Sequence, residues 1–151
     1  MSLQNCGVES DSVFEKPTEE HLFNSRCYKS TSVRIGVAHG VLQVDPRRFK
    51  FHRMSVPAVA TDIHVVGRFK VIAGGDRDIA VYVLDAKGFD SWQAGRKAFF
   101  HYESRRANTD IFNVKLPTGG TYYLMFDNSF SIRSPKSVEV DVELIYKTIQ
   151  I

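Results

Sequence analysis

One segment near the end of the chain, in which apolar and acidic residues alternate one for one, constrains the fold more than any other feature. It runs from Lys136 to Tyr146, where the apolar and acidic positions are Val138, Glu139, Val140, Asp141, Val142, Glu143 and Leu144. Successive side chains of a β-strand point to opposite faces of its sheet, so one face of this strand is buried and the other meets water. The segment therefore predicts a strand with an apolar face and an acidic face.

The same two-residue period recurs along most of the chain beyond residue 31. Apolar residues occupy alternate positions in five further segments, whose predicted core residues are Tyr122, Leu124 and Phe126; Ile79, Val81 and Val83; Ile63, Val65, Gly67, Phe69 and Val71; Val33, Ile35 and Val37; and Phe49 and Phe51. A looser alternation covers residues 99–103 and 110–116. Gly, Pro, Asp and Asn separate these segments every ~8–12 residues, which is typical of an antiparallel sandwich or barrel.

These patterns predict an all-β protein, an antiparallel β-sandwich of about eight strands with a jelly-roll or immunoglobulin-like architecture. We expect one short helical turn over residues 88–95, with Asp90 capping its start and Gly95 ending it. No longer helix is expected, because no segment holds an apolar period of 3.6 residues over three turns.

The chain divides into an arm and one domain. Its 151 residues suffice for a single domain, and its hydrophobic (43%) and charged (25%) shares are those of a globular protein. Residues 1–30 show no sustained period and are predicted to form an N-terminal tail or arm, whereas residues 31–151 form the sandwich domain. Cys6 and Cys27 are too few for a disulfide framework and too poorly spaced for a zinc site.

Targeting signals are not evident in the sequence. No uncharged apolar run approaches the ~18 residues of a membrane-spanning helix, so we expect no membrane span in this chain. The start lacks the basic and apolar regions of a secretory signal, but Met-Ser-Leu also fits an expression-vector remnant, so an upstream signal or anchor stays open. We therefore assign no compartment.

Charge is unevenly distributed along the chain. Residues 1–30 carry a net charge of −2, and the remainder carries +5 from 17 basic and 12 acidic side chains. A domain with this surplus can attract acidic peptides or anionic headgroups. It lacks the concentrated basic stripe of nucleic-acid binders, so we expect no nucleic-acid partner.

Two stretches of the second half carry a family resemblance. A Gly-Gly-x-x-Asp-Ile turn begins at Gly74, a Gly-x-Tyr-x-x-x-Phe-x-Asn strand begins at Gly120, a Phe-Ser loop follows at Phe130, and a Lys-x-Val strand begins at Lys136. In this order the motifs resemble the GOLD domain of the p24 (emp24) cargo receptors and of Sec14-like lipid-transfer proteins. The resemblance covers roughly residues 56–147 and implies a β-sandwich that serves as an interaction module.

The sequence also departs from the p24 pattern. The p24 lumenal domains usually carry a cysteine of a disulfide at the place of Met125, and they continue into a coiled coil and a membrane span, whereas this sequence ends at Ile151. The resemblance is therefore to a stand-alone soluble form of the module, and Golgi transport is not carried over.

The residues of these motifs have structural explanations. Gly74 and Gly75 allow positive φ in a tight turn, in which either Asp76 or Asp78 is predicted to accept backbone N–H groups as an Asx-type turn, and Asn128 is predicted to do the same at the end of its strand. Lys136 is expected to pair with a nearby Asp or to protect a sheet edge.

A calcium site is the alternative interpretation of Asp76 and Asp78. Because Ca²⁺ takes about 6–8 oxygen ligands, Asp45 or Asp127 would have to join Asp76 and Asp78, and we favour the structural reading with no metal.

Catalytic motifs are missing from the sequence. The five histidines are isolated from one another, and there is no nucleophile elbow or phosphate-binding glycine loop. We expect neither enzymatic activity nor a cofactor.

Two features are candidate binding surfaces. The first is a group of basic residues, Arg47, Arg48, Lys50 and Arg53, around a strand in which Phe49 and Phe51 are predicted to point inward. Arg48, Lys50 and His52 are then expected to form a basic row on the outward face. Such a row could meet acidic peptide or lipid headgroups. The favoured alternative is a solvated face whose charges pair with Glu139, Asp141 and Glu143 across strands.

The second feature is the connection from residue 86 to residue 96, which holds Trp92, together with a later loop that contains Arg105 and Arg106. Binding residues of sandwiches concentrate in such loops. A lone Trp is more often a lid over a core than an anchor for a partner, and its burial distinguishes the two.

We therefore predict a non-catalytic interaction module that binds a protein, or an anionic lipid, through its loops or a basic sheet face. The alternative is an accessory carbohydrate- or calcium-binding sandwich of a larger extracytoplasmic protein.

Overall fold

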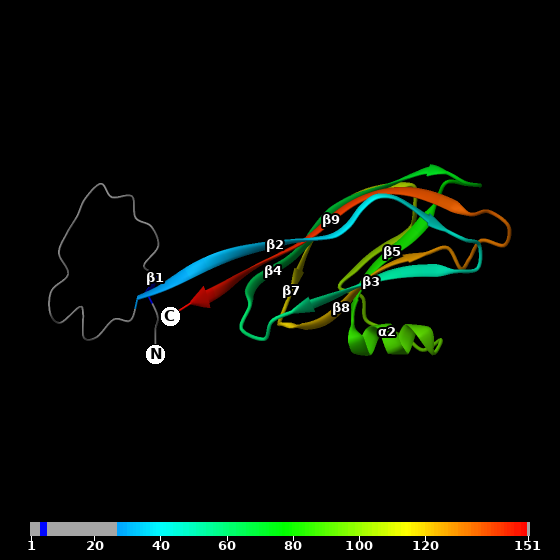
Figure 1. Cartoon of the computed structure of the whole chain (residues 1–151). Helices are drawn as coiled ribbons and strands as arrows, with labels where there is room; N and C mark the ends of the chain where they lie inside the picture. The colour runs from blue at the N-terminus through cyan, green and yellow to red at the C-terminus, as the bar shows by residue number, and fades with distance from the viewer. Residues whose placement is uncertain (1–3, 6–26, 151) are drawn as a thin grey trace, which may run out of the picture.

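Two sheets pack face to face in the computed structural model, which describes residues 4–5 and 27–150 (Figure 1). The elements in chain order are β1 (Gln4–Asn5), β2 (Cys27–Val44), β3 (Phe49–Val56), β4 (Thr61–Ala73), β5 (Ile79–Asp85), α2 (Ala86–Gln93), β6 (Tyr102–Ala107), β7 (Thr109–Leu116), β8 (Gly120–Asp127) and β9 (Lys136–Gln150). The predicted antiparallel β-sandwich is confirmed. The predicted helical segment is α2, and among the described residues it is the only helix.

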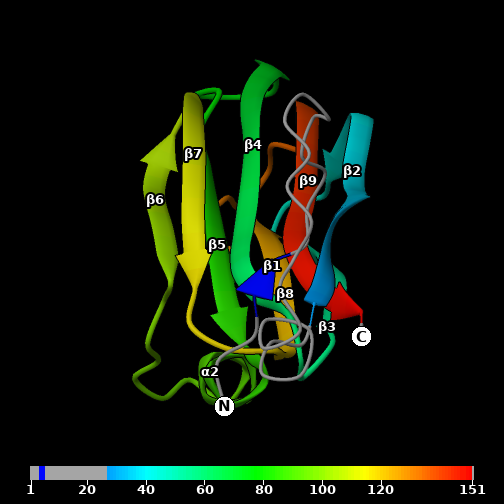
Figure 2. The ribbon, with the colours of Figure 1, turned by 90° about the vertical axis from the view of Figure 1, so that its left-hand side faces the viewer.

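The first sheet has the strand order β1-β2-β9-β4-β7, and the second has the order β3-β8-β5-β6. Figure 2 shows β6 and β7 along one side of the sandwich, and β2 and β3 along the other. All neighbouring pairs are antiparallel except β1 and β2, which pair in parallel at their first residues. β2 begins at Cys27, slightly before the predicted domain start, and residues 6–26 of the predicted arm lie outside the described residues.

The core lies between the two sheets and is built from the predicted alternation. Its fully buried residues include the predicted core faces of β4, β5, β8 and β9, among them Phe69, Val81, Phe126 and Val142 at 1% exposure or less. The acidic residues between the core residues of β9 point to the outer face. There Glu139 lies opposite Lys70 of β4, and Asp141 lies opposite Arg68.

In β3 the predicted orientation is wrong. Met54 and Val56 are buried in the core, and His52 lies edge-on to Phe126 there, whereas Phe51 is 46% exposed on the opposite face. Side chains alternate in a strand, so an error of one residue moves the whole apolar set to the other face. Both faces of β3 carry apolar residues, and alternation alone could not decide between them.

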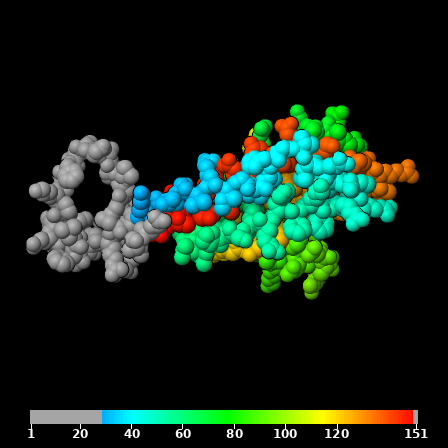
Figure 3. Space-filling model, viewed as in Figure 1, coloured from blue at the N-terminus to red at the C-terminus, as the bar shows by residue number. Residues whose placement is uncertain are grey.

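The outer aromatic residues of β3 belong to a second, smaller cluster under α2. Leu84, Phe89 and Met125 form its buried centre, and Phe49, Trp92 and Tyr123 pack against it. Figure 3 shows the α2 segment standing out from the second sheet, in the green-yellow part of the surface. The helix thus gives Phe49 an apolar environment on the outer face of the second sheet, which the sequence predicted to be exposed to solvent.

The caps of α2 correct one prediction and confirm another. Asp85, not Asp90, caps the start, because its carboxylate accepts the N–H of Gly88 at 2.6 Å. Gly95 follows the end of the helix with φ of 73°, as expected of a residue that ends a helix.

β2 contains an irregularity that the sequence did not predict. Its register against β9 shifts between Gly36 and Ala38. Val33 and Ile35 face inward before the shift, and Ala38 and Val44 face inward after it. Ile35 is nevertheless 41% exposed.

No helix among the described residues is long and apolar enough to span a membrane.

Candidate functional site

The candidate site lies at one end of the sandwich, where three connections meet: residues 45–48, residues 74–78 and residues 128–135. We call this the loop end. The 74–78 connection is a tight turn in which the N–H of Arg77 donates to the carbonyl of Gly74 at 2.8 Å. Gly74 and Gly75 have φ of 114° and 49°, so the predicted positive φ values are confirmed. A side chain on Gly74 would collide with the carbonyl oxygen of Pro135, so the turn packs directly against the start of β9.

Lys136 and Asp78 join the turn to the last strand. Lys136 is 2% exposed, and its Nζ donates to the carbonyl oxygen of Asp78 at 2.6 Å and to its Oδ1 at 2.9 Å. A buried ammonium group is costly unless it is paired and hydrogen-bonded, and Asp78 meets both needs. The expected pairing of Lys136 with a nearby Asp is confirmed.

Arg106 of β6 binds the same carboxylate from the other side. Its Nε and its terminal nitrogen both lie 3.0 Å from Oδ2 of Asp78. Burial alone would raise the pKa of Asp78, but the hydrogen bonds and charges of Lys136 and Arg106 outweigh it and hold that pKa below its usual value. Asp78 is therefore an ionised bridge between β6 and β9 rather than the predicted Asx turn.

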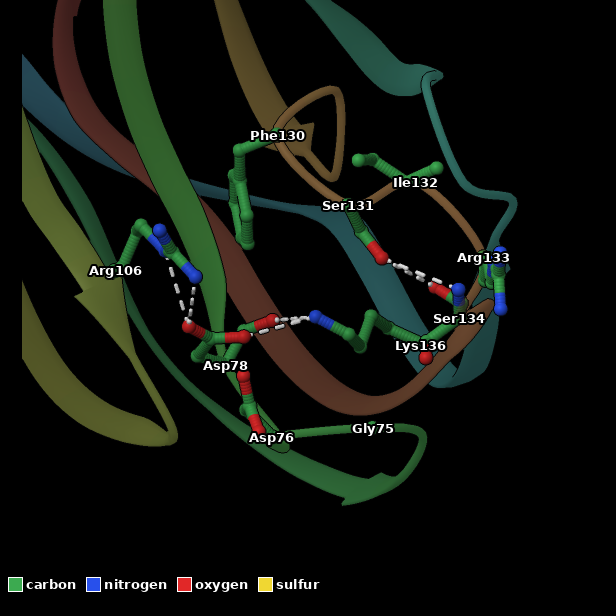
Figure 4. Close-up of a pocket in the computed structure, with 10 residues that line it drawn as sticks. All are labelled: Gly75, Asp76, Asp78, Arg106, Phe130, Ser131, Ile132, Arg133, Ser134 and Lys136. Carbon is green, nitrogen blue, oxygen red and sulfur yellow. Dashed lines mark hydrogen bonds and ion pairs between the residues drawn. The ribbon is translucent and has the colours of Figure 1, made fainter.

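A pocket of about 490 Å³ opens beside this bridge (Figure 4). Its lining residues come from the turn, from β6 and from the loop before β9: Gly75, Asp76, Asp78, Arg106, Phe130, Ser131, Ile132, Arg133, Ser134 and Lys136. The ring of Phe130 lies 4.0 Å from the guanidinium of Arg106 and 4.9 Å from Nζ of Lys136. Two cations thus contact one aromatic ring, which stabilises both.

The loop after β8 is held by Asn128, which is fully buried. Its side-chain amide donates to the carbonyls of Val44, Asp45 and Ser134 at 2.9–3.2 Å. The predicted Asx turn of Asn128 is therefore wrong, and Asp127 makes that turn instead by accepting the N–H of Ser129 at 2.9 Å. Asn128 ties the 45–48 connection to the 128–135 loop, and backbone hydrogen bonds from Arg47 to Asn128 and Ser131 reinforce this contact.

The three connections bring basic residues together. The cations of the loop end are Arg47, Arg48, Arg77, Arg106, Arg133 and Lys136, and its carboxylates are Asp45, Asp76, Asp78 and Asp127. Six cations stand against four carboxylates, and four cations still stand against three carboxylates when Asp78 and its two partners are set aside, so the loop end carries an excess of positive charge. Ile132, 67% exposed, places an apolar side chain within the basic surface.

The six binding residues predicted from sequence do not form one surface. Arg106 lines the pocket and Arg48 lies in the neighbouring connection, whereas Arg105 is largely exposed and does not line the pocket. Trp92 lies on α2, is half-buried, and packs against the second cluster with its ring 4.9 Å from that of Phe49.

The predicted basic row on β3 is also corrected. Lys50 alternates with the outer aromatic residues and shares a face with His52 and Met54, while Arg53 lies on the opposite face over the ring of Tyr123. The acidic row of β9 belongs to the other sheet and pairs there. Glu143 binds Arg34 at 2.6 Å, and Asp141 binds His39 at 2.9 Å.

Sequence reasoning missed Phe130, Ile132 and Arg133. Only the family resemblance points to the Phe-Ser loop, although the loop holds an aromatic residue and an arginine, two residue types that are enriched where proteins bind one another.

The aspartates of the turn do not form a metal centre with their neighbours. Both carboxylate oxygens of Asp78 are taken by cations. Within residues 4–5 and 27–150, no group of three or more His, Cys, Asp or Glu side chains is arranged to hold a metal ion.

The protein-family model described as emp24/gp25L/p24 family/GOLD matches residues 58–149. No curated protein matches the chain. The matched residues include the whole lining of the pocket, whereas β2 and β3 lie before them.

Proposed function

Because the chain belongs to the emp24/gp25L/p24 family/GOLD, we propose that it is a non-catalytic binding module whose loop end holds an acidic segment of a partner protein. The family is one of binding modules of the cargo-receptor type, which supports a protein partner.

The observation that carries the proposal is the arrangement around Phe130. Its ring and two cations form one wall of the pocket, while Arg133 and Ile132 at the rim are exposed. Arginine and aromatic side chains are enriched where proteins bind one another, and an exposed arginine can bind a carboxylate in two parallel hydrogen bonds. A peptide segment with acidic and apolar residues matches both parts of this surface.

The rigidity of the site supports the same function. Lys136, Asp78 and Asn128 fix the turn and the loop through partly buried hydrogen bonds. A ligand therefore meets a surface that is already ordered, and less conformational entropy is lost when it binds.

The calcium-binding alternative is disfavoured at this site, because both carboxylate oxygens of Asp78 bind cations, one Lys136 and the other Arg106.

Fluorescence anisotropy with a labelled Asp- and Glu-rich peptide tests the proposal. The double variant Arg77→Glu/Arg133→Glu reverses two exposed charges of the loop end and is expected to weaken binding about tenfold or more. The control is Lys115→Glu, an exposed residue next to the end of β7, at the opposite end of the sandwich. Equal binding by the wild type and the double variant would overturn the proposal.

A second arm separates a protein ligand from a lipid. The same proteins are sedimented with vesicles of phosphatidylcholine alone and with vesicles that also contain phosphatidylserine. If the wild type, but not the double variant, sediments with the anionic vesicles and does not bind the peptide, the ligand of the loop end is a membrane surface and not an acidic protein segment.

A further inference from the structure

The two outer faces of the sandwich differ in composition. On the first sheet, acidic residues of β9 lie beside basic residues of the neighbouring strands, and Glu143 and Asp141 pair with Arg34 and His39 of β2. On the second sheet, α2 and the segment after it lie against the face, and Figure 2 shows the helix on the outer side of this sheet. The second outer face is aromatic and basic.

Aromatic rings of this face reach the solvent beside α2. Phe51 of β3 is 46% exposed, although it packs on Phe89 of the helix with ring centroids 5.1 Å apart. Phe99, in the segment 94–101 between α2 and β6, is 69% exposed. One exposed apolar residue is common on a protein surface, but two phenylalanines and the half-buried Trp92 on one face form a candidate contact surface.

The segment after α2 is held in place although it forms neither helix nor strand. Phe100 stacks on Tyr82 of β5 with ring centroids 4.6 Å apart, and the N–H of His101 donates to the carbonyl of Val83 at 2.8 Å. Phe99 therefore extends from an anchored segment, and less conformational entropy is lost when its ring is buried in a partner.

Four exposed cations lie beside these rings: Arg53 of β3, Lys87 of α2, and Arg96 and Lys97 of the segment after it. Among the residues that the structure describes, none of the four forms an ion pair. Their charges are therefore available to a negatively charged partner, unlike those of the paired cations on the first sheet.

The carboxylates of the same face are fewer. Asp85 accepts the N–H of Gly88 as the cap of α2, and Glu103, opposite a residue of β5, lies 3.9 Å from Arg105. The remaining carboxylate is that of Asp90 on α2. Counted with Arg105, five cations stand against these three carboxylates, so the face attracts a negatively charged surface.

The shape of this face favours a membrane over a peptide. α2 protrudes from the second sheet, as Figures 1 and 3 show, so the face is convex. An extended peptide binds at a sheet edge or in a groove, whereas the interface of a bilayer accepts the apolar side chains of a helix that lies on it. Lys and Arg side chains keep their charges at the headgroups while their aliphatic stems lie deeper.

We call this surface the α2 face and define it by its exposed phenylalanines and unpaired cations, Phe51, Arg53, Lys87, Arg96, Lys97 and Phe99. We propose that the α2 face docks onto a membrane surface that contains anionic lipids. The two phenylalanine rings enter the region below the headgroups, and the four cations contact headgroup oxygens. Each cation near an anionic surface contributes about a fivefold gain in affinity. The α2 face does not include the loop end and does not depend on it.

Sedimentation with vesicles tests the docking. The full chain is expected to sediment with vesicles of phosphatidylcholine and phosphatidylserine, to be released from them at high salt, and not to sediment with phosphatidylcholine alone. The variant Arg96→Glu/Lys97→Glu is expected to bind about twentyfold more weakly. Its matched control, Lys70→Glu/Lys115→Glu, reverses two exposed charges on the outer face of the first sheet and is expected to bind like the wild type.

Tryptophan fluorescence tests the insertion of Phe99. Trp92 is the single tryptophan of the chain, so the variant Trp92→Phe/Phe99→Trp moves the fluorophore to the proposed point of insertion. Lipids brominated on their acyl chains are expected to quench it. The control Trp92→Phe/Ile111→Trp carries the fluorophore at an 80% exposed position of the first sheet, where no quenching is expected. Equal quenching in the two variants would overturn the proposal.

The loop-end variant Arg77→Glu/Arg133→Glu separates the two sites. It is expected to lose the acidic peptide while it still sediments with the anionic vesicles. If this variant loses the vesicles and Arg96→Glu/Lys97→Glu keeps them, the membrane binds at the loop end and docking through the α2 face is wrong. Failure of the wild type to sediment with the anionic vesicles would also overturn it, without bearing on the acidic peptide.

Discussion

Lys136 and Asp78, 58 residues apart in the chain, form a buried ion pair in which one ammonium group satisfies both the carbonyl and the carboxylate of one residue. The pair holds the Gly74–Gly75 turn against the start of β9 and forms one wall of the pocket. Arg106 completes it by binding the second carboxylate oxygen. The stability of the loop end therefore depends on the charge state of Asp78.

Removing either partner is expected to destabilise the fold by unequal amounts. Asp78→Asn leaves the buried ammonium of Lys136 without a counter-charge and should cost about 3–5 kcal/mol in the free energy of unfolding. Lys136→Met should cost less, about 2–3 kcal/mol, because Arg106 still pairs with Asp78. Urea denaturation measures both.

The double variant Asp78→Asn/Lys136→Met provides the control. Its loss should be clearly smaller than the sum of the single losses, since neither charge is then left alone. Additive losses would show that the two side chains act independently.

Stability is expected to fall as the pH drops below about 6.5, well before most carboxylates titrate. Burial lowers the pKa of His101, against the opposing effect of Asp85, and burial together with Lys50 lowers the pKa of His52. In the unfolded chain these imidazoles take up protons near pH 6.5, whereas in the folded chain they do so only at lower pH. Their contribution is therefore complete above that pH and is lost as the pH falls through their folded pKa values.

Urea midpoints measured between about pH 7 and pH 5 check this expectation. The double variant His52→Gln/His101→Gln, which cannot titrate in this range, should show a flatter dependence. Asp78 also has a lowered pKa, but its contribution is lost only below its usual value of 3.8, so the two effects separate on the pH axis. An unchanged slope in the double variant would assign the dependence to other groups.

Two phenylalanine variants, one in β3 and one in β8, test which face of each strand is buried. Phe126 is fully buried in the main core, and Phe126→Ala should cost about 3–5 kcal/mol. Phe51, 46% exposed on the outer face, should cost about 1 kcal/mol when changed to Ala.

Thermal and urea unfolding of both variants give the comparison. If Phe126→Ala does not fold, Phe126→Leu supplies a milder loss that still exceeds that of Phe51→Ala. Similar losses at the two positions would place Phe51 in the core.

Substitutions at two glycines with positive φ distinguish the cost of backbone strain from the cost of a steric collision. Gly74 and Gly40 have φ of 114° and 97°, but only Gly74 has atoms where a Cβ would lie. Gly40→Ala should cost about 1–2 kcal/mol through strain alone, and Gly74→Ala should cost more because Pro135 must also move.

Differential scanning calorimetry of the two variants measures the difference. Equal melting temperatures would mean that the 74–78 turn can move away from residues 135–136 without a loss of stability.

The sequence by itself determined the class of fold and most of the core. Wherever apolar residues alternate with charged or polar ones, as in Val138–Leu144, only one face of the strand can be buried, so the buried faces of β4 and β9 follow from local pattern. Gly74 and Gly75 likewise follow from the turn that they require.

Only the tertiary structure decided which face of β3 is buried, because both of its faces are apolar and the choice depends on where α2 packs. The same holds for the candidate site. Asn128, Arg106 and Phe130 acquire their roles from connections that lie far apart in the chain and meet only when the two sheets close on each other. Local alternation of apolar and polar residues predicts which side chains are buried. The hydrogen-bond partners of buried polar groups, in contrast, are determined by long-range packing.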